Sequence, residues 1–150
     1  SPKFLTVHAA GGNKMIKAAV DALPNGSITA VTVLTSFSEP DFAAMGQKNS
    51  IEETTKSWAQ MAISSGATSL VCSPFEVGAL RILSTTATLI TPGVRVEGDA
   101  AGDQARIMSP SQAISAGADL VVIGRSITSL WDGSDLNMRK KIEQIASTLG

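Results

Sequence analysis

Five short, continuously apolar runs alternate with longer amphipathic stretches along this chain of 150 residues. Continuous runs of this kind are typical of parallel strands covered on both faces, whereas a strand with one solvated face alternates apolar and polar residues. Strands separated by helices predict an α/β fold assembled from βα units. The predicted strands are Phe4–His8, Ile28–Leu34, Ser69–Cys72, Thr88–Thr91 and Leu120–Ile123.

The stretches between the predicted strands carry signals for the ends of helices. Ser50 and Glu53 have the spacing of a capping box, in which each side chain accepts a hydrogen bond from a free amide of the first turn. Ser109-Pro110 indicates a second helix start, with a capping hydroxyl followed by proline. Gly66 and Gly117 each separate a helical stretch from a strand, where a left-handed residue ends a helix.

Composition and charge argue against several classes of function. The formal net charge of −1 and the pI of about 5.7 leave no basic stripe for a nucleic-acid backbone. No apolar run approaches the roughly 18 residues that span a bilayer, and the N-terminus has no signal-peptide pattern. The single cysteine, Cys72, cannot form an internal disulfide, which favours a reducing compartment. We expect a cytoplasmic protein with no nucleic-acid or membrane partner.

Two architectures accommodate five strands with helices between them: an open doubly wound sheet and part of a closed (β/α)8 barrel. A complete barrel takes about 250 residues. A barrel chain of 150 residues is therefore short by roughly three βα units. Residues 1–3 lead directly into the first predicted strand, without a preceding helix or cap, so the chain looks cut at its N-terminal side. No linker divides it into separate domains.

Several motifs, taken in order, resemble those of one enzyme family. Leu89–Arg95 reads LITPGVR, residues 98–106 read GDAAGDQAR, and Ala118–Thr128 reads ADLVVIGRSIT. Their order and spacing are similar to the end of orotidine 5′-monophosphate decarboxylases. Val7–Gly12 and Val31–Ser36 are similar to the ends of that family's fourth and fifth strands.

The resemblance covers nearly the whole chain and carries expectations about fold and function. It implies a partial (β/α)8 TIM barrel with strands 4–8 and their helices, so that residues 1–150 are the C-terminal part of a single barrel domain lacking three N-terminal βα units. It also implies a lyase of pyrimidine biosynthesis that converts orotidine 5′-monophosphate (OMP) to UMP and CO2 without metal or organic cofactor. Because the family forms homodimers, the resemblance implies a homodimer here. It also implies that the N-terminal part of the barrel is required to complete this chain.

The end of the chain has the residue types that a phosphate site requires. In barrels, the loops after the last two strands commonly hold a substrate phosphate. Arg125 supplies two parallel N–H donors to a dianion, and Gly124 allows close approach of the backbone. Gln104 adds an amide from the loop that follows Pro92.

The resemblance assigns roles to the same positions. The family residues matching Gln104 and Arg125 bind the 5′-phosphate, and the residue matching Thr35 contacts the pyrimidine. Pro92 and Arg95 match residues at the mouth of the site. Thr35 alternatively bonds to backbone at a strand end, and Arg95 alternatively pairs with an aspartate of its own loop. The predicted substrate-binding set is Thr35, Pro92, Arg95, Gln104, Gly124 and Arg125.

Other chemically interesting side chains receive structural interpretations. His8 is the only histidine, and we interpret it as a packed, hydrogen-bonded residue at a strand end. Cys72 lies in an apolar run and is interpreted as a small buried hydrophobe. Trp58 and Trp131 are interpreted as core or interface packing. One histidine and one cysteine cannot build a metal site.

The catalytic residues that the resemblance implies have no match in this sequence. In the family, lysines and aspartates on the first three strands, above all in a D-x-K-x-x-D-I-P-N-T segment before the fourth strand, destabilise the leaving carboxylate region and stabilise the carbanion, which a lysine then protonates. No such segment is present, so we expect no catalytic residue in this chain and no activity from it alone. The lysines are Lys3, Lys14, Lys17, Lys48, Lys56, Lys140 and Lys141.

Three alternatives to this function stay open. A sister barrel enzyme, such as a hexulose-phosphate synthase or a ketogulonate-phosphate decarboxylase, would share the terminal Gly-Arg site but require Mg²⁺. A non-catalytic half-barrel that binds phosphorylated metabolites would show affinity without turnover. An open flavodoxin-like domain would bind flavin, but no Ser/Thr-rich phosphate loop follows the first predicted strand.

Overall fold

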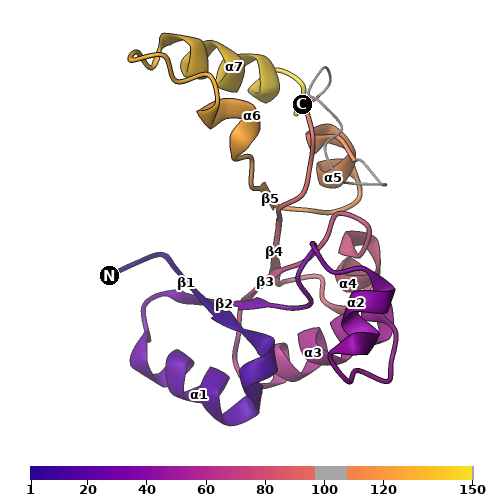
Figure 1. The fold of residues 1–150 in the computed structure, drawn as a ribbon. Coiled ribbons are helices and arrows are strands. Elements are labelled where there is room, and N and C mark those ends of the chain that lie inside the picture. The colour runs from indigo at the N-terminus through magenta and orange to yellow at the C-terminus, as the bar shows by residue number, and fades with distance from the viewer. Residues whose placement is uncertain (97–107, 150) are drawn as a thin grey trace.

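The computed structural model describes residues 1–96 and 108–149, which form a parallel sheet with helices on its outer side (Figure 1). Neighbours in the sheet are neighbours in the chain, in the order β1-β2-β3-β4-β5. A doubly wound sheet reverses its strand order, whereas a barrel winds in one direction. The open-sheet and flavodoxin-like alternatives are therefore wrong. The strands are β1 Phe4–His8, β2 Ser27–Val31, β3 Ser69–Val71, β4 Thr88–Thr91 and β5 Leu120–Val121.

The helices continue the arc of the sheet. Figure 1 shows α1, α3, α4 and α5 along the outer, convex side, with α6 and α7 beyond β5. A short 3-10 helix, η1, connects β1 to α1. The helical elements are η1 Ala9–Gly11, α1 Gly12–Ala22, α2 Glu39–Ala44, α3 Ile51–Ser64, α4 Val77–Leu83, α5 Pro110–Ser115, α6 Arg125–Thr128 and α7 Leu136–Ala146.

The hydrophobic core lies between the sheet and the outer helices. Leu70 in the central strand β3 is fully buried and pairs in register with Ala30 and Leu89. Because side chains alternate along a strand, the neighbouring positions face the concave side. There, Thr29 and Ser69 join their hydroxyl groups at 2.6 Å. The sheet therefore has an apolar outer face and a partly polar inner layer.

Two predicted strands have the observed bounds, and the other three end sooner or begin earlier than predicted. Phe4–His8 and Thr88–Thr91 are confirmed. The second strand ends at Val31, not at Leu34, because its neighbour β3 ends at Val71. Beyond the shared ladder, no partner strand remains to hold the chain in the sheet.

The predicted helix ends are confirmed. Ser50 and Glu53 form a reciprocal capping box, in which each backbone amide donates to the other residue's side chain at 3.1 and 3.2 Å. Ser109 caps α5, where Gln112 completes a second capping box that the sequence prediction had not identified. Gly66 and Gly117 have φ angles of 98° and 113°, in the left-handed region that favours glycine.

Replacing Ser50 with alanine is expected to destabilise the protein by about 1 kcal/mol, because the amide of Glu53 loses its acceptor. Urea unfolding of wild type and variant measures the difference. Ser57, which is exposed on the same helix, supplies the control: its alanine variant is expected to change stability by less than about 0.5 kcal/mol. Equal effects of the two substitutions would contradict the capping role.

The structural interpretations of four residues have mixed outcomes. Cys72 is fully buried, as predicted, and Trp58 packs partly buried against the core. The packed, hydrogen-bonded position predicted for His8 is wrong for this chain, because His8 is exposed at the end of β1, an edge strand of the described sheet. The core interpretation of Trp131 is also wrong, since 60% of this residue is exposed. Its alternative role in an interface stays a prediction.

Candidate functional site

The carboxyl ends of the parallel strands meet at one edge of the sheet, where a cavity of about 870 Å³ opens. Its walls come from the loops after β2, β3 and β4, from the first turns of α3 and from the start of α6. Sites in barrel proteins lie at this edge because the strand ends bring distant loops together. The cavity is therefore the candidate site.

Three of the six predicted substrate-binding residues line this cavity. Thr35 comes from the loop after β2, Arg95 from the loop after β4, and Arg125 from the first residue of α6. Pro92 and Gly124 are sequence neighbours of lining residues but do not line the cavity themselves. Gln104 lies outside the described residues.

The Pro-Gly turn brings two of the predicted motifs into contact. Gly93 has a φ angle of 82°, which an L side chain rarely adopts. A Cβ atom on Gly93 would lie 3.9 Å from the Thr35 hydroxyl and 3.8 Å from Cδ of Pro74. The turn after β4 thus lies within van der Waals distance of the loops after β2 and β3, and it is the positive φ angle that favours glycine at this position.

Arg95 occupies the base of the loop that contains Gln104. Its backbone amide donates to the carbonyl of Met108 at 3.0 Å, so the two ends of this loop are tied together. Its Nη1 donates to the carbonyl of Val94 at 3.2 Å. The predicted pairing of Arg95 with Asp99 or Asp103 lies outside the described residues.

Most charged side chains of the cavity wall already have partners. Glu39 accepts the amide of Ile51 at 3.1 and 3.2 Å, and Glu52 pairs with Lys56 at 2.6 Å. Glu76 accepts the amide of Ser73 at 3.0 Å. These carboxylates are anchored to their own wall of the cavity.

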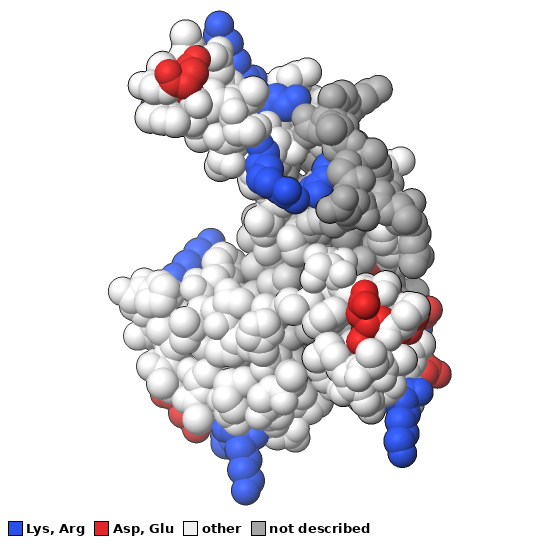
Figure 2. All heavy atoms as spheres, viewed as in Figure 1, with Lys and Arg blue, Asp and Glu red and all other residues white. Residues whose placement is uncertain are grey.

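Arg125 differs from these groups. Its exposed guanidinium makes no hydrogen bond or ion pair with any other residue that the structure describes. Figure 2 shows Lys and Arg side chains gathered on the upper wall of the molecule's hollow, apart from the acidic side chains visible on that face. An anion is the ligand that such an unneutralised cation attracts.

The sequence analysis missed the loop after β3. Ser73, Pro74, Phe75 and Glu76 line the cavity beside Thr35. The available signal was their position directly after the predicted strand that ends at Cys72. In a parallel sheet, residues at this position lie at the same edge as those that follow the neighbouring strands.

Cys72 directly precedes this loop, and its thiol is chemically unreactive. Burial, together with the nearby Glu76 carboxylate, raises the pKa of its thiol to about 12. The thiolate is the nucleophilic form of cysteine, so the folded protein keeps this residue protonated and inert at neutral pH. The prediction of a small buried hydrophobe agrees with this environment.

The raised pKa of Cys72 makes part of the stability dependent on alkaline pH. Above about pH 9 the unfolded chain loses the thiol proton while the folded chain keeps it until about pH 12. The unfolded state then binds fewer protons, so stability falls as pH rises through this window. Comparing urea unfolding of wild type and Cys72→Ala at pH 7 and pH 10.5 tests this: the wild-type advantage is expected to shrink at the higher pH. A constant difference would contradict it.

The described residues contain no group of three or more His, Cys, Asp or Glu side chains that could hold a metal ion. In the same part of the chain, no helix has the length and apolar character needed to cross a membrane.

Sequentially ordered parallel strands, a curved sheet and cationic side chains beyond the strand ends define this chain as part of a (β/α)8 barrel. The family model described as "Orotidine 5'-phosphate decarboxylase / HUMPS family" matches residues 3–133. The chain belongs to this family, and the resemblance seen in its motifs is confirmed.

Curated relatives support the same family. The chain is 51% identical over 129 residues to the orotidine 5'-phosphate decarboxylase of Thermobifida fusca, with 85% of this chain and 55% of that protein covered. It is 47% identical over 132 residues to the enzyme of the same name from Frankia casuarinae, with 87% and 48% covered. The chain thus spans about half the length of these relatives.

Solved structures confirm the fold. The crystal structure of orotidine 5'-phosphate decarboxylase from Lactobacillus acidophilus superposes with a TM-score of 0.81 at 30% identity, over 99% of this chain and 63% of that one. The predicted partial (β/α)8 barrel is therefore confirmed.

Proposed function

We propose that this chain forms the phosphate- and pyrimidine-binding side of an OMP decarboxylase, which converts OMP to UMP and CO2. The observation that carries the proposal is the guanidinium of Arg125, which is unpaired among the described residues and shares one cavity with Thr35 and Arg95 at the carboxyl edge of the sheet. Family membership and the names of the relatives support the same substrate.

Each residue of the predicted set then has a role. Arg125 binds the 5′-phosphate through two N–H donors, with Gln104 as a second donor and Gly124 leaving room for the oxygens: a Cβ on Gly124 would meet nothing within 4 Å. Thr35 contacts the pyrimidine. Arg95, with Pro92, borders the mouth of the site at the base of the Gln104 loop.

Phosphate binding contributes to catalysis although the phosphate does not react. Binding energy from a remote group supports loop closure and orients the reacting centre, so that its loss lowers the rate as well as the affinity. Holding the phosphate beyond the last strand fixes one end of the substrate. The pyrimidine end is then directed toward the loop that contains Thr35.

In this proposal, the catalytic groups that act on the carboxylate of OMP and on the carbanion formed from it belong to an N-terminal part of the barrel. Of the seven lysines, only Lys56 lines the cavity, and Glu52 holds its Nζ at 2.6 Å.

We propose further that residues 1–150 are the C-terminal part of one barrel domain, and that the completed barrel is a cytoplasmic homodimer. Light scattering of the full-length protein measures the oligomeric state.

The test is OMP turnover followed by pyrimidine absorbance, with EDTA present to remove metal ions. The full-length protein is expected to decarboxylate OMP in EDTA. The 150-residue chain is expected to do so only after a fragment with the first three βα units is added. Loss of activity in EDTA with recovery in Mg²⁺ would instead indicate a sister enzyme of the metal-dependent type. UMP binding without turnover in any combination would indicate a binding protein.

A further inference from the structure

Glu39, the first residue of α2, links the loop after β2 to helix α3. Both of its carboxylate oxygens accept the backbone amide of Ile51, at 3.1 and 3.2 Å. Ile51 is the first residue of α3, so its amide has no acceptor within the helix. Because the start of a helix carries a partial positive charge, a carboxylate is a favoured acceptor there. A hydrogen bond across 12 residues therefore fastens α2 to the start of a longer helix.

Thr35 lies between two fixed points of the chain. Three residues before it, the amide and the hydroxyl group of Thr32 both donate to the carbonyl of Val71, at 3.1 and 2.9 Å. Four residues after it, Glu39 accepts from Ile51. The segment from Thr32 to Glu39 is thus held to β3 at one end and to α3 at the other, and Thr35 lines the cavity from its middle.

The remaining contacts of α2 are local or apolar. Ser38 caps this helix by accepting the amide of Asp41 at 3.3 Å. Phe42 is 2% exposed, with its ring centroid 6.1 Å from that of Phe37. A cap stabilises a helix without attaching it to another element, and hydrophobic burial has no preferred direction. Among the residues that the structure describes, the bond of Glu39 is therefore the directional contact that sets the position of α2 and of the loop before it.

This contact lies away from the open side of the arc. Figure 1 shows α2 on the right, whereas the arc opens to the left between β1 and α7. The βα units that would complete the proposed barrel belong in that opening, between β1 and β5. Closure of the barrel therefore leaves the bond between Glu39 and Ile51 in place.

We propose that Glu39 is a positioning residue, which holds Thr35 where it contacts the pyrimidine of the substrate. The inference rests on the proposed function, because the pyrimidine contact of Thr35 is part of that function. The effect of Glu39 is confined to the pyrimidine end of the site, since Arg125, which is assigned to the phosphate, follows β5 and not β2.

Three substitutions separate the charge of Glu39 from its reach. Glu39→Met removes the acceptor and keeps a side chain of similar length. Glu39→Asp keeps the charge, but its carboxylate is one methylene shorter and lies too far from the amide of Ile51. Glu39→Gln loses the charge and keeps an acceptor oxygen at the same distance, so it is expected to restore wild-type behaviour. Ser50→Ala is the matched control, because it removes a cap from the same end of α3 and leaves the link to α2 intact.

The experiment measures the Kd of each full-length variant for UMP and for ribose 5-phosphate, which lacks the pyrimidine. Glu39→Met and Glu39→Asp are expected to weaken UMP binding about three- to tenfold, the effect of losing one neutral hydrogen bond. Ribose 5-phosphate is expected to bind these two variants as it binds wild type. Glu39→Gln and Ser50→Ala are expected to keep the wild-type Kd for both ligands, even where Ser50→Ala lowers Tm.

A double-mutant cycle tests whether Glu39 acts through Thr35. Thr35→Val removes the proposed pyrimidine contact by itself, so it is expected to weaken UMP binding. In the Thr35→Val protein, Glu39→Met is expected to weaken UMP binding by less than about twofold further, because the group that Glu39 positions is already gone.

Wild-type UMP affinity in Glu39→Met and Glu39→Asp would overturn the inference, as would equal losses for the two ligands or independent effects of Glu39 and Thr35. If Glu39→Met fails to fold, Glu39→Asp decides the question, because it keeps the charge at the start of α2. A wild-type protein that does not bind UMP, or a Thr35→Val protein with wild-type UMP affinity, would instead overturn the proposed function.

Discussion

Replacement of Arg125 with alanine is expected to lower kcat/KM for OMP by about 10²- to 10⁴-fold. The side chain is proposed to donate two charge-assisted hydrogen bonds to the phosphate, each contributing about 1.5–3 kcal/mol. A loss of about 1.36 kcal/mol corresponds to a tenfold change in rate. Of the other cations that line the cavity, Lys56 is paired with Glu52, and Arg95 is proposed to border the mouth of the site. Steady-state kinetics of the full-length protein measure the effect.

Two further variants sharpen this test. Arg125→Lys keeps the positive charge but loses the paired donors, so an intermediate kcat/KM is expected. Arg139→Ala removes an exposed arginine that pairs with Asp135 at the start of its own helix, and kcat/KM is expected to stay within about twofold of wild type. A decrease of less than about fivefold in Arg125→Ala would remove this residue from the phosphate site.

Replacement of Leu70 with alanine is expected to destabilise the protein by about 2–5 kcal/mol. Leu70 is fully buried in the central strand and packs in the core between the sheet and the outer helices. Truncating it removes apolar contacts and leaves a cavity that the neighbouring strands cannot close, since both of them are held in register by their ladders. Urea unfolding of the full-length protein measures the change.

The control for Leu70 is another large apolar residue in a different environment. Ile82 on α4 is 87% exposed, and Ile82→Ala is expected to change stability by less than about 0.5 kcal/mol. The contrast separates burial from residue type. Similar losses in the two variants would contradict the placement of the core between sheet and helices.

Local features could be predicted from the sequence because short-range chemistry determines them. The capping box of Ser50 and Glu53 depends on residues three apart, and the left-handed turns at Gly66 and Gly117 depend on the absence of a Cβ atom. The βα alternation followed from continuous apolar runs, since strands covered on both faces are rich in apolar residues. The family motifs added Arg125 and Thr35, two residues that share the cavity.

The end of each strand could not be predicted from the sequence. Val33 is apolar, β-branched and buried, yet β2 ends before it because the ladder with β3 stops at Val71. Pairing partners, and not the propensity of the segment itself, set this boundary.

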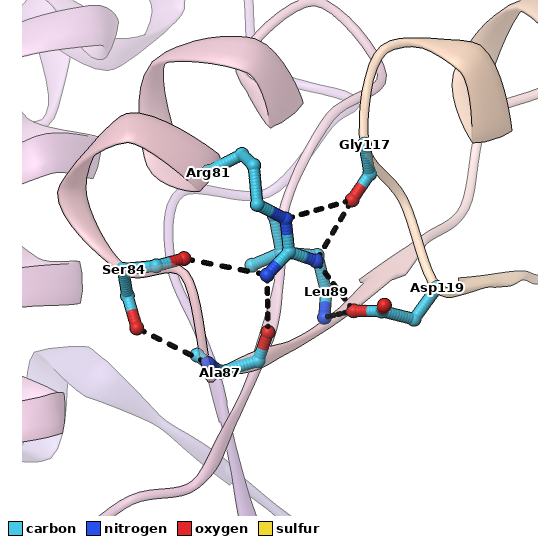
Figure 3. Close-up of polar contacts among 6 residues, drawn as sticks. All are labelled: Arg81, Ser84, Ala87, Leu89, Gly117 and Asp119. Carbon is cyan, nitrogen blue, oxygen red and sulfur yellow. Dashed lines mark hydrogen bonds and ion pairs between the residues drawn. The ribbon is translucent and has the colours of Figure 1, made fainter.

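Long-range pairing was likewise decided by the tertiary structure alone. In the sequence, Arg81 and Asp119 are an unremarked arginine and aspartate, 38 residues apart. Only the folded chain shows that Arg81 and the amide of Leu89 donate to the same oxygen of Asp119 (Figure 3). Only the folded chain shows, likewise, that Glu39, Glu52 and Glu76 are anchored while Arg125 is unpaired among the described residues. The sequence determined which residues were available to the site and where its helices begin. Which charges neutralise one another depends on the distances between loops, and these distances exist only once the sheet has formed.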